Sequence, residues 1–138
     1  MNRPEKIIVV ADDDQDDQEL LQEVLLGIEK NAQVLTFSAG KEVLHYLQSC
    51  ELHQRPCLII LDYNMPDLNG AQVTEIIYAD DSYKHVPVLV WSTSNSHVYR
   101  MECEQKGARN YFYKPYDYQQ IVEMAKQMLS YCEDEVPK

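Results

Sequence analysis

The distribution of apolar residues divides the chain into two kinds of segment. Continuous apolar runs occupy residues 7–11, 57–61 and 88–91. Uninterrupted runs of this length are typical of strands that are buried on both faces, as in the centre of a parallel sheet. Weaker runs at 34–37 and 111–113 predict two further strands, so we expect a sheet of five strands.

Amphipathic stretches lie between the strands. Their apolar residues recur every three or four positions, which places them on one face of a helix. The predicted helices cover stretches near residues 20–28, 43–47, 71–78, 97–106 and 121–129. Asp16 and Asp17 can cap the first helix and favour the positive end of its dipole. Charged residues leave the stretch 97–106 only a thin apolar stripe, so we expect this helix to be loosely held.

The alternation of strands with helices predicts the fold class. Short connections between them imply right-handed crossovers and a parallel sheet with helices on both faces, which is a doubly wound α/β domain. A chain of 138 residues has room for one such core, which we assign to residues 1–132, followed by a short polar tail at 133–138. In sheets of this kind the functional residues lie beyond the carboxyl ends of the strands.

Charge and hydropathy exclude several classes of function. The formal net charge of -11 opposes binding to nucleic acid or to an anionic membrane, because both surfaces would repel the chain. The apolar runs are far shorter than the roughly 20 residues that span a bilayer. Residues 1–6 lack the features of a secretory leader. We therefore expect a cytoplasmic protein that binds neither nucleic acid nor membranes directly.

The cysteines and histidines indicate no metal site. Cys50, Cys57, Cys103 and Cys132 show no paired spacing, and in a reducing cytosol they are expected to be thiols rather than disulfides. The histidines are scattered and form no cluster with cysteine. We therefore expect no metal-binding cysteine or histidine.

Polar residues that could carry chemistry follow four of the predicted strands. They are Asp12, Asp13 and Asp14 after the first strand, Asp62 after the third, Ser92 and Thr93 after the fourth, and Lys114 and Pro115 after the fifth. Carboxylates gathered at one edge repel each other unless a cation neutralises them, and Mg²⁺ prefers oxygen ligands of this kind. Asp62 could then act as a nucleophile toward phosphorus, with the metal and Lys114 balancing the charge.

Each of these residues alone has an ordinary interpretation. An acidic residue after a strand is usually a turn former or a helix cap, as we expect for Asp14, Asp16 and Asp17. Ser92, Thr93 and a lone Lys-Pro pair would be loop or surface residues. Their joint occurrence at the ends of the expected strands favours a functional site.

The chain resembles the receiver domain of two-component response regulators from about residue 6 to about residue 131. The matching stretches are residues 7–14, residues 61–70 with the pattern D-x-N-M-P-x-x-N-G, residues 86–92 and residues 113–115. It is most similar to the stand-alone receivers that serve phytochrome-type, chemotaxis-type and other histidine kinases. The resemblance implies a flavodoxin-like strand order 2-1-3-4-5 and a single-domain response regulator of a phosphorelay.

The resemblance also implies a phosphoacceptor and a metal site. Asp62 would accept the phosphoryl group. The cofactor would be Mg²⁺ or Mn²⁺, bound directly by Asp13 and Asp62, mainly through water by Asp12, and by the backbone carbonyl of Asn64. The phosphoryl donor would be a sensor histidine kinase or a histidine phosphotransfer protein.

A switch is implied by the same resemblance. Lys114 and Ser92 would contact the phosphoryl group, Tyr111 would be the aromatic switch residue, and the Lys114–Pro115 bond would be cis. The output, and a possible homodimer, would use the face built by the fourth helix, the fifth strand and the fifth helix. Arg100 and Glu104 depart from the apolar residues that relatives often carry on the fourth helix, which leaves the character of this face open.

Two other classes of protein share this topology. An aspartate-dependent phosphohydrolase of the dehalogenase-like type would need a second aspartate two residues after the nucleophile, where this chain has Asn64. A flavin-binding electron carrier would need hydroxyls and amides in its first loop, where Asp12 and its acidic neighbours would repel a phosphate. We therefore expect a phosphoacceptor rather than an enzyme. Whether the phosphorylated form binds a partner, passes its phosphate on or drains a kinase stays open at this point.

Overall fold

The computed structural model describes residues 6–132. Five strands alternate with five helices, and a short 3-10 helix precedes the third strand. In chain order they are β1 (Lys6–Ala11), α1 (Gln15–Ile28), β2 (Ala32–Phe37), α2 (Gly40–Ser49), η1 (Leu52–Gln54), β3 (Leu58–Asp62), α3 (Gly70–Tyr78), β4 (Val88–Ser92), α4 (His97–Lys106), β5 (Asn110–Tyr113) and α5 (Tyr118–Ser130). The polar tail expected at 133–138 lies outside the described residues, as do residues 1–5 of the expected domain.

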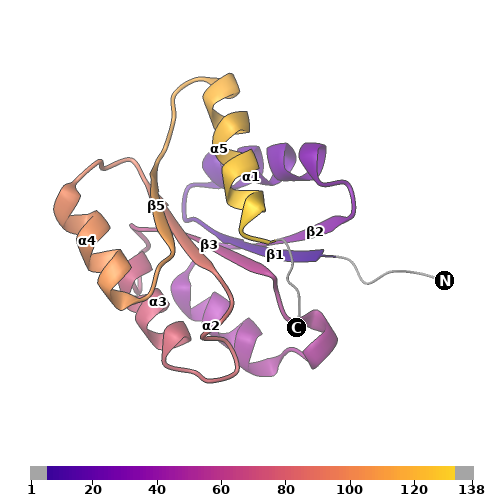
Figure 1. The fold of residues 1–138 in the computed structure, drawn as a ribbon, viewed down its shortest axis with the longest axis vertical. Coiled ribbons are helices and arrows are strands. Elements are labelled where there is room, and N and C mark those ends of the chain that lie inside the picture. The colour runs from indigo at the N-terminus through magenta and orange to yellow at the C-terminus, as the bar shows by residue number, and fades with distance from the viewer. Residues whose placement is uncertain (1–5, 133–138) are drawn as a thin grey trace.

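All five strands belong to one parallel sheet with the order β2-β1-β3-β4-β5, which confirms the predicted doubly wound fold and its flavodoxin-like order. Helices α1 and α5 cover one face of the sheet, and α2, α3 and α4 cover the other (Figure 1). The strand order reverses between β1 and β3. Their carboxyl ends therefore border the crevice in which sheets of this type place their functional residues.

Burial on both faces explains why the strand sequences are continuously apolar. Successive residues of a strand point to opposite faces. In β1, Ile8 and Val10 join the core beneath α1 and α5, whereas Val9 and Ala11 join the core beneath α2 and α3. The other central strands divide in the same way, so a polar residue at any of these positions would enter a core.

Polar side chains cap the N-termini of α1, α3, α4 and α5, whereas α2 has no side-chain cap. The Asp14 side chain accepts the Asp17 N–H at 3.1 Å, so Asp14 caps α1 while Asp16 and Asp17 lie in its first turn. Asn69 and Gln72 form a reciprocal capping box at the start of α3. Within residues 6–132, no helix is both long enough and apolar enough to cross a membrane.

Helix α4 is the least anchored helix, as its sequence predicts. Cys103 is its only buried residue, whereas Val98 and Met101 are exposed. The helix ends at Gly107, whose φ of 120° suits glycine, and a Cβ there would lie 2.7 Å from the Tyr78 ring. Its apolar packing is limited to Cys103 and the partly buried Tyr99, so directed contacts must also help to hold α4 in place.

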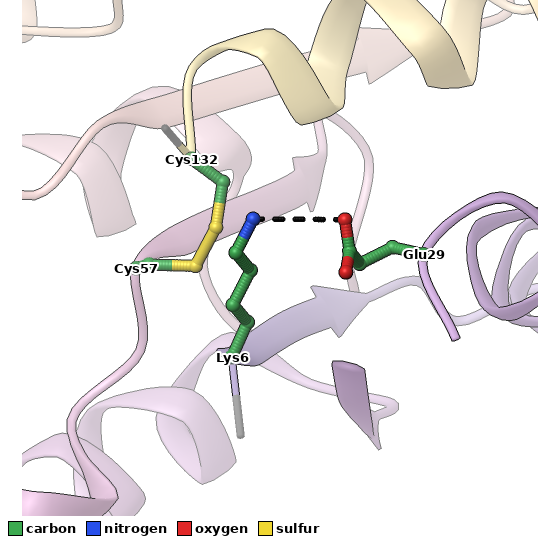
Figure 2. Close-up of a disulfide and its surroundings, with 4 residues drawn as sticks. All are labelled: Lys6, Glu29, Cys57 and Cys132. Atoms are coloured by element: carbon green, nitrogen blue, oxygen red, sulfur yellow. Dashed lines mark ion pairs between the residues drawn. A yellow bond between two sulfur atoms is a disulfide. The ribbon is translucent and has the colours of Figure 1, made fainter. Parts of the chain in front are cut away.

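The expectation that all four cysteines are thiols is wrong for one pair. Cys57 and Cys132 form a disulfide that ties the start of β3 to the residues after α5, with their Cα atoms 5.3 Å apart (Figure 2). Cys50 and Cys103 are free thiols. The pairing has no local signal because 75 positions separate the two residues, and only the fold brings them together.

The expectation of a cis Lys114–Pro115 bond is also wrong. The backbone between residues 6 and 132 contains no cis peptide bond. Trans is the more stable form of a bond before proline by about 0.5–1 kcal/mol. With this bond trans, Lys114 still lies at the carboxyl edge of the sheet, where its ammonium reaches the acidic residues described below.

Candidate functional site

Three aspartates meet at the carboxyl ends of β1 and β3. Asp12 and Asp13 follow β1, and Asp62 is the last residue of β3. Each offers a carboxylate oxygen, and these oxygens lie within 4.8 Å of one another. Asp12 and Asp62 are 0% and 4% exposed, whereas Asp13 is exposed. The structure therefore assembles the acidic cluster that the sequence predicts, with one open side.

Lys114 lies within this cluster, directly after β5. Its ammonium donates to Asp12 Oδ2 and to Asp17 Oδ2, both at 2.9 Å, and lies 3.5 Å from Asp62 Oδ1. The same ammonium stands 4.6 Å from the centre of the Trp91 ring. A buried ammonium needs such partners because leaving it unpaired would cost several kcal/mol. Lys114 is thus the cation around which the carboxylates are arranged.

Burial and the neighbouring charges together shift the pKa values of these groups. Burial raises the pKa of Asp62, and the neighbouring Asp12 carboxylate raises it further. Burial likewise raises the pKa of Asp12, although Lys114 partly offsets this. Burial disfavours the charged form of Lys114, but its hydrogen bonds to Asp12 and Asp17 outweigh burial and raise its pKa. At neutral pH, Lys114 therefore stays charged, and the two buried carboxylates resist being ionised together.

The cluster fits a hard divalent cation. Its donors are carboxylate oxygens, the ligands that Mg²⁺ and Mn²⁺ prefer, and the exposed Asp13 leaves room for water ligands. Asp12, Asp13 and Asp62 are the residues that would hold the ion. Asn64 donates its backbone N–H to Asp62 Oδ1 at 3.4 Å, and the metal contact of its carbonyl stays a prediction.

Asp17 is a site residue that the sequence alone does not reveal. We expected it to be a helix cap, but its side chain pairs with Lys114 at 2.9 Å. The cap at Asp14 sets the phase of α1, so that the first turn carries Asp17 toward the end of β5. No spacing in the sequence signals a contact between residues 97 positions apart.

The two expected switch residues lie on the neighbouring strands β4 and β5. Ser92, the last residue of β4, is fully buried, and its hydroxyl accepts the Ser94 N–H at 3.0 Å. The Tyr111 ring is buried as well, and its hydroxyl donates to the Ser94 carbonyl at 2.7 Å. The roles of Ser92 and Tyr111 as switch residues stay a prediction.

Tyr63 connects the cluster to α4. It follows Asp62, stacks on Tyr99 of α4 with ring centres 4.3 Å apart, and donates its hydroxyl to Glu102 at 2.7 Å. Gly70 allows the backbone to pack closely here, because a Cβ at this position would lie 3.0 Å from the Asp62 carbonyl oxygen. Sequence reasoning missed Tyr63 because nothing in the chain's pattern indicates which helix it meets.

A family model decides the class of protein. The model described as response regulator receiver domain matches residues 8–126. The chain belongs to this family. The receiver family consists of signalling proteins of two-component systems, which agrees with the predicted class.

Individual relatives agree with this assignment. The receiver is 32% identical over 98 residues to response regulator Rcp1 from Synechocystis sp., a match that covers 69% of this chain and 67% of Rcp1. It is 30% identical over 126 residues to chemotaxis protein CheV2 from Helicobacter pylori, covering 91% of this chain but only 39% of that longer protein.

Solved structures of relatives share the whole fold. The phosphorylated cyanobacterial phytochrome response regulator RcpA matches with a TM-score of 0.82 and 28% identity, covering 92% of this receiver and 93% of RcpA. The Mn²⁺-bound form of Rcp1 matches with a TM-score of 0.81 and 25% identity, covering 96% and 97% of the two chains.

Removing Asp13 should weaken metal binding more than removing an acidic neighbour. Asp13→Ala removes one of the three carboxylates of the cluster. We expect the Mg²⁺ affinity to fall by about 10–100-fold or more, because losing even an outer partner of a metal site has effects of that size. Asp16→Ala removes the same charge from an exposed position and serves as the control. Trp91 fluorescence reports binding because Lys114 lies over its ring. Equal losses in the two variants would contradict the assignment of Asp13.

Asp62→Asn should stabilise the metal-free protein. The raised pKa of Asp62 means that its ionisation opposes folding once the pH exceeds the ordinary carboxyl value of 3.8. We expect the variant to gain at least about 1 kcal/mol in unfolding free energy at pH 8 in EDTA, since one pKa unit corresponds to about 1.4 kcal/mol. The gain should vanish below pH 3.8. Urea unfolding at several pH values measures it, and a gain that persists unchanged in acid would refute this origin.

Proposed function

We propose that this receiver is a single-domain response regulator of a phosphorelay that accepts a phosphoryl group on Asp62. The environment of the Asp62 carboxylate supports this proposal. It ends a central strand, is 4% exposed, and lies within reach of Lys114 and of the Asp12 and Asp13 oxygens. A strand end of this kind holds the nucleophile rigidly while leaving one side open to a donor.

The proposed step is an exchange of bonds at phosphorus. A carboxylate oxygen of Asp62 attacks the phosphorus of a phosphohistidine, an O–P bond forms, and the N–P bond breaks. The electron pair of that bond returns to the imidazole nitrogen of the donor, which takes up a proton. The donor is a sensor histidine kinase or a histidine phosphotransfer protein.

Lys114 neutralises charge during this step. Its ammonium already lies 3.5 Å from Asp62 Oδ1, close to where the oxygens of an attached phosphoryl group would lie. Asp12 and Asp17 hold the ammonium in this position. Bound Mg²⁺ or Mn²⁺ would supply the remaining positive charge that the phosphoryl oxygens need.

The phosphohydrolase alternative has less support. Position 64, where such an enzyme would need its acid, is an asparagine that cannot donate a proton to a leaving group. The family match covers residues 8–126 and describes a receiver. We therefore assign the chain a signalling role in which any loss of phosphate from Asp62 is slow and self-catalysed.

The phosphoryl group should attach to Asp62 and only in the presence of a divalent metal. We expect acetyl phosphate or phosphoramidate with Mg²⁺ to add one phosphoryl group, visible as a mass increase that is stable in acid and lost in base. Asp62→Asn should remain unlabelled because the amide is a far weaker nucleophile.

Asp14→Asn is the matched control, since it makes the same change in an exposed helix cap. It should be labelled like the parent. Labelling of the Asp62→Asn variant at the parent's rate, or labelling that survives EDTA, would disprove the proposed site.

We place the output on the face formed by α4, β5 and α5. Apolar side chains are exposed on these elements and on the loop before α5, among them Val98 at 70%, Tyr116 at 89% and Tyr118. A homodimer, if phosphorylation drives one, is expected to use this same face. The net charge of -11 opposes nucleic acid as a direct partner, and we propose that the protein acts in the cytoplasm.

Two sets of contacts tie this face to the phosphoacceptor. Tyr63, next to Asp62, holds α4 through Tyr99 and Glu102. Arg100 of α4 donates to the Tyr111 carbonyl at 2.7 Å, and Tyr111 bonds the loop that follows Ser92. A phosphoryl group that draws the Ser92 hydroxyl toward itself would loosen the bond from the Ser94 N–H and change this loop.

Phosphorylation should therefore change hydrogen exchange in α4 and the loop before it. We expect a beryllofluoride mimic to alter exchange at residues 94–106, while residues 24–28 of α1 stay unchanged because Val24 and Leu25 anchor this turn in the opposite core. Ser92→Ala should still be labelled on Asp62 but should show a smaller change in exchange.

Ser49→Ala, which removes an exposed hydroxyl from α2, is the control and should respond like the parent. A full response in Ser92→Ala, or a response confined to α1, would rule out this route from the phosphoryl group to the output face.

A further inference from the structure

A pocket lies at the amino ends of the strands, at the opposite end of the sheet from the acidic cluster. It has a volume of about 480 Å³, within the range of small-molecule sites. The segments before β3, β4 and β5 form its walls together with the residues after α5. Its lining includes Arg55, Cys57, Ser82, His85, Arg109 and Cys132.

The charge of this pocket is opposite to that of the chain. The protein carries a net charge of -11, yet among residues 6–132 the pocket is lined by two arginines and by no aspartate or glutamate. The Arg109 guanidinium donates to the His85 carbonyl at 3.2 Å, and the Arg55 guanidinium lies 5.2 Å from the centre of the Tyr83 ring. Neither arginine forms a salt bridge within residues 6–132. Among the contacts that the structure describes, both positive charges are therefore available to an anionic ligand.

The disulfide forms part of the same pocket wall. Cys57 and Cys132 both line the pocket, Cys57 is half-buried, and Cys132 is almost fully buried. Positive charge near a sulfur favours the thiolate form, which is both the nucleophile and the leaving group of disulfide exchange. The pocket thus combines a cleavable S–S bond with groups that attract carboxylates.

We propose that Cys57 and Cys132 are a redox-active pair and that this pocket binds an anionic low-molecular-weight thiol of the glutathione class. The carboxylates of the thiol would face Arg55 and Arg109, whose planar guanidinium groups match carboxylate geometry. Disulfides in reducing compartments are usually redox-sensing or catalytic rather than structural. The proposal does not depend on phosphoryl transfer at Asp62, since the pocket lies at the other end of the strands.

The small thiol reduces the Cys57–Cys132 disulfide in two successive thiol–disulfide exchanges. The thiolate of the first ligand molecule attacks the Sγ atom of Cys57, the more exposed of the two cysteines, and Cys132 leaves as a thiolate that takes up a proton. A second thiolate attacks the ligand's sulfur in this mixed disulfide, which releases Cys57 and the disulfide of the small thiol. Two electrons pass from the two thiols to the cysteine pair, and the disulfide of the small thiol drives the reverse reaction.

The test compares small disulfides of different charge. The full chain with Cys50→Ser is reduced, freed of reductant and mixed with glutathione disulfide, with neutral hydroxyethyl disulfide or with cationic cystamine. Acid quenching and intact mass measurement give the rate of oxidation. We expect glutathione disulfide to react faster than the other two, and Arg55→Gln with Arg109→Gln to slow it on the order of tenfold without slowing hydroxyethyl disulfide.

Two further variants make the result specific. Lys41→Gln with Lys126→Gln removes the same charge from residues outside the pocket and should keep the preference for glutathione disulfide. Cys132→Ser should accumulate a mixed disulfide on Cys57, because no second sulfur displaces the ligand.

Three outcomes would overturn the proposal. The first is that the reduced cysteine pair does not oxidise. The second is that the double arginine variant keeps the parent's preference for glutathione disulfide. The third is that the double lysine variant loses as much of this preference as the double arginine variant. An unfolded arginine variant would react faster with all three disulfides, so a selective loss for glutathione disulfide distinguishes binding from damage to the fold.

Discussion

The ammonium of Lys114 is the interaction on which the carboxyl edge of this sheet depends. Two buried carboxylates, Asp12 and Asp62, end neighbouring strands, and their mutual repulsion would be severe without a cation between them. Lys114 supplies that charge from β5, at the far side of the sheet from β1. The arrangement joins the first and last strands electrostatically and leaves a site that gains by recruiting further positive charge.

Direct side-chain contacts connect the carboxyl edge of the sheet to helix α4. Helix α4 buries only Cys103, so its position depends on directed contacts from Tyr63 and Tyr111 rather than on a wide apolar face. Tyr63 directly follows Asp62, and Tyr111 lies three residues before Lys114. A small change near Asp62 therefore acts on the element with the least packing to oppose it, whereas α1 and α5 share a continuous core that would resist such a change.

Much of the fold could be predicted from the sequence because the central strands are buried on both faces. Runs such as residues 57–61 admit no polar residue, and the acidic residues stand where those runs stop. Contacts between distant residues could not be predicted. The pairing of Asp17 with Lys114 depends on the phase of α1, and the Cys57–Cys132 disulfide depends on where α5 ends. Neither has a spacing rule. The resemblance suggested a cis bond before Pro115, but the bond is trans, as the general preference of prolyl bonds predicts.

The position of the disulfide along the chain also sets when it can form during biosynthesis. Cys57 precedes β3, but Cys132 follows α5, the last helix. The bond can form only after the ribosome has synthesised all of residues 57–132. All five strands have been synthesised by then. Sulfur chemistry therefore cannot guide any strand pairing that precedes the synthesis of α5, and such pairing rests on the apolar runs alone.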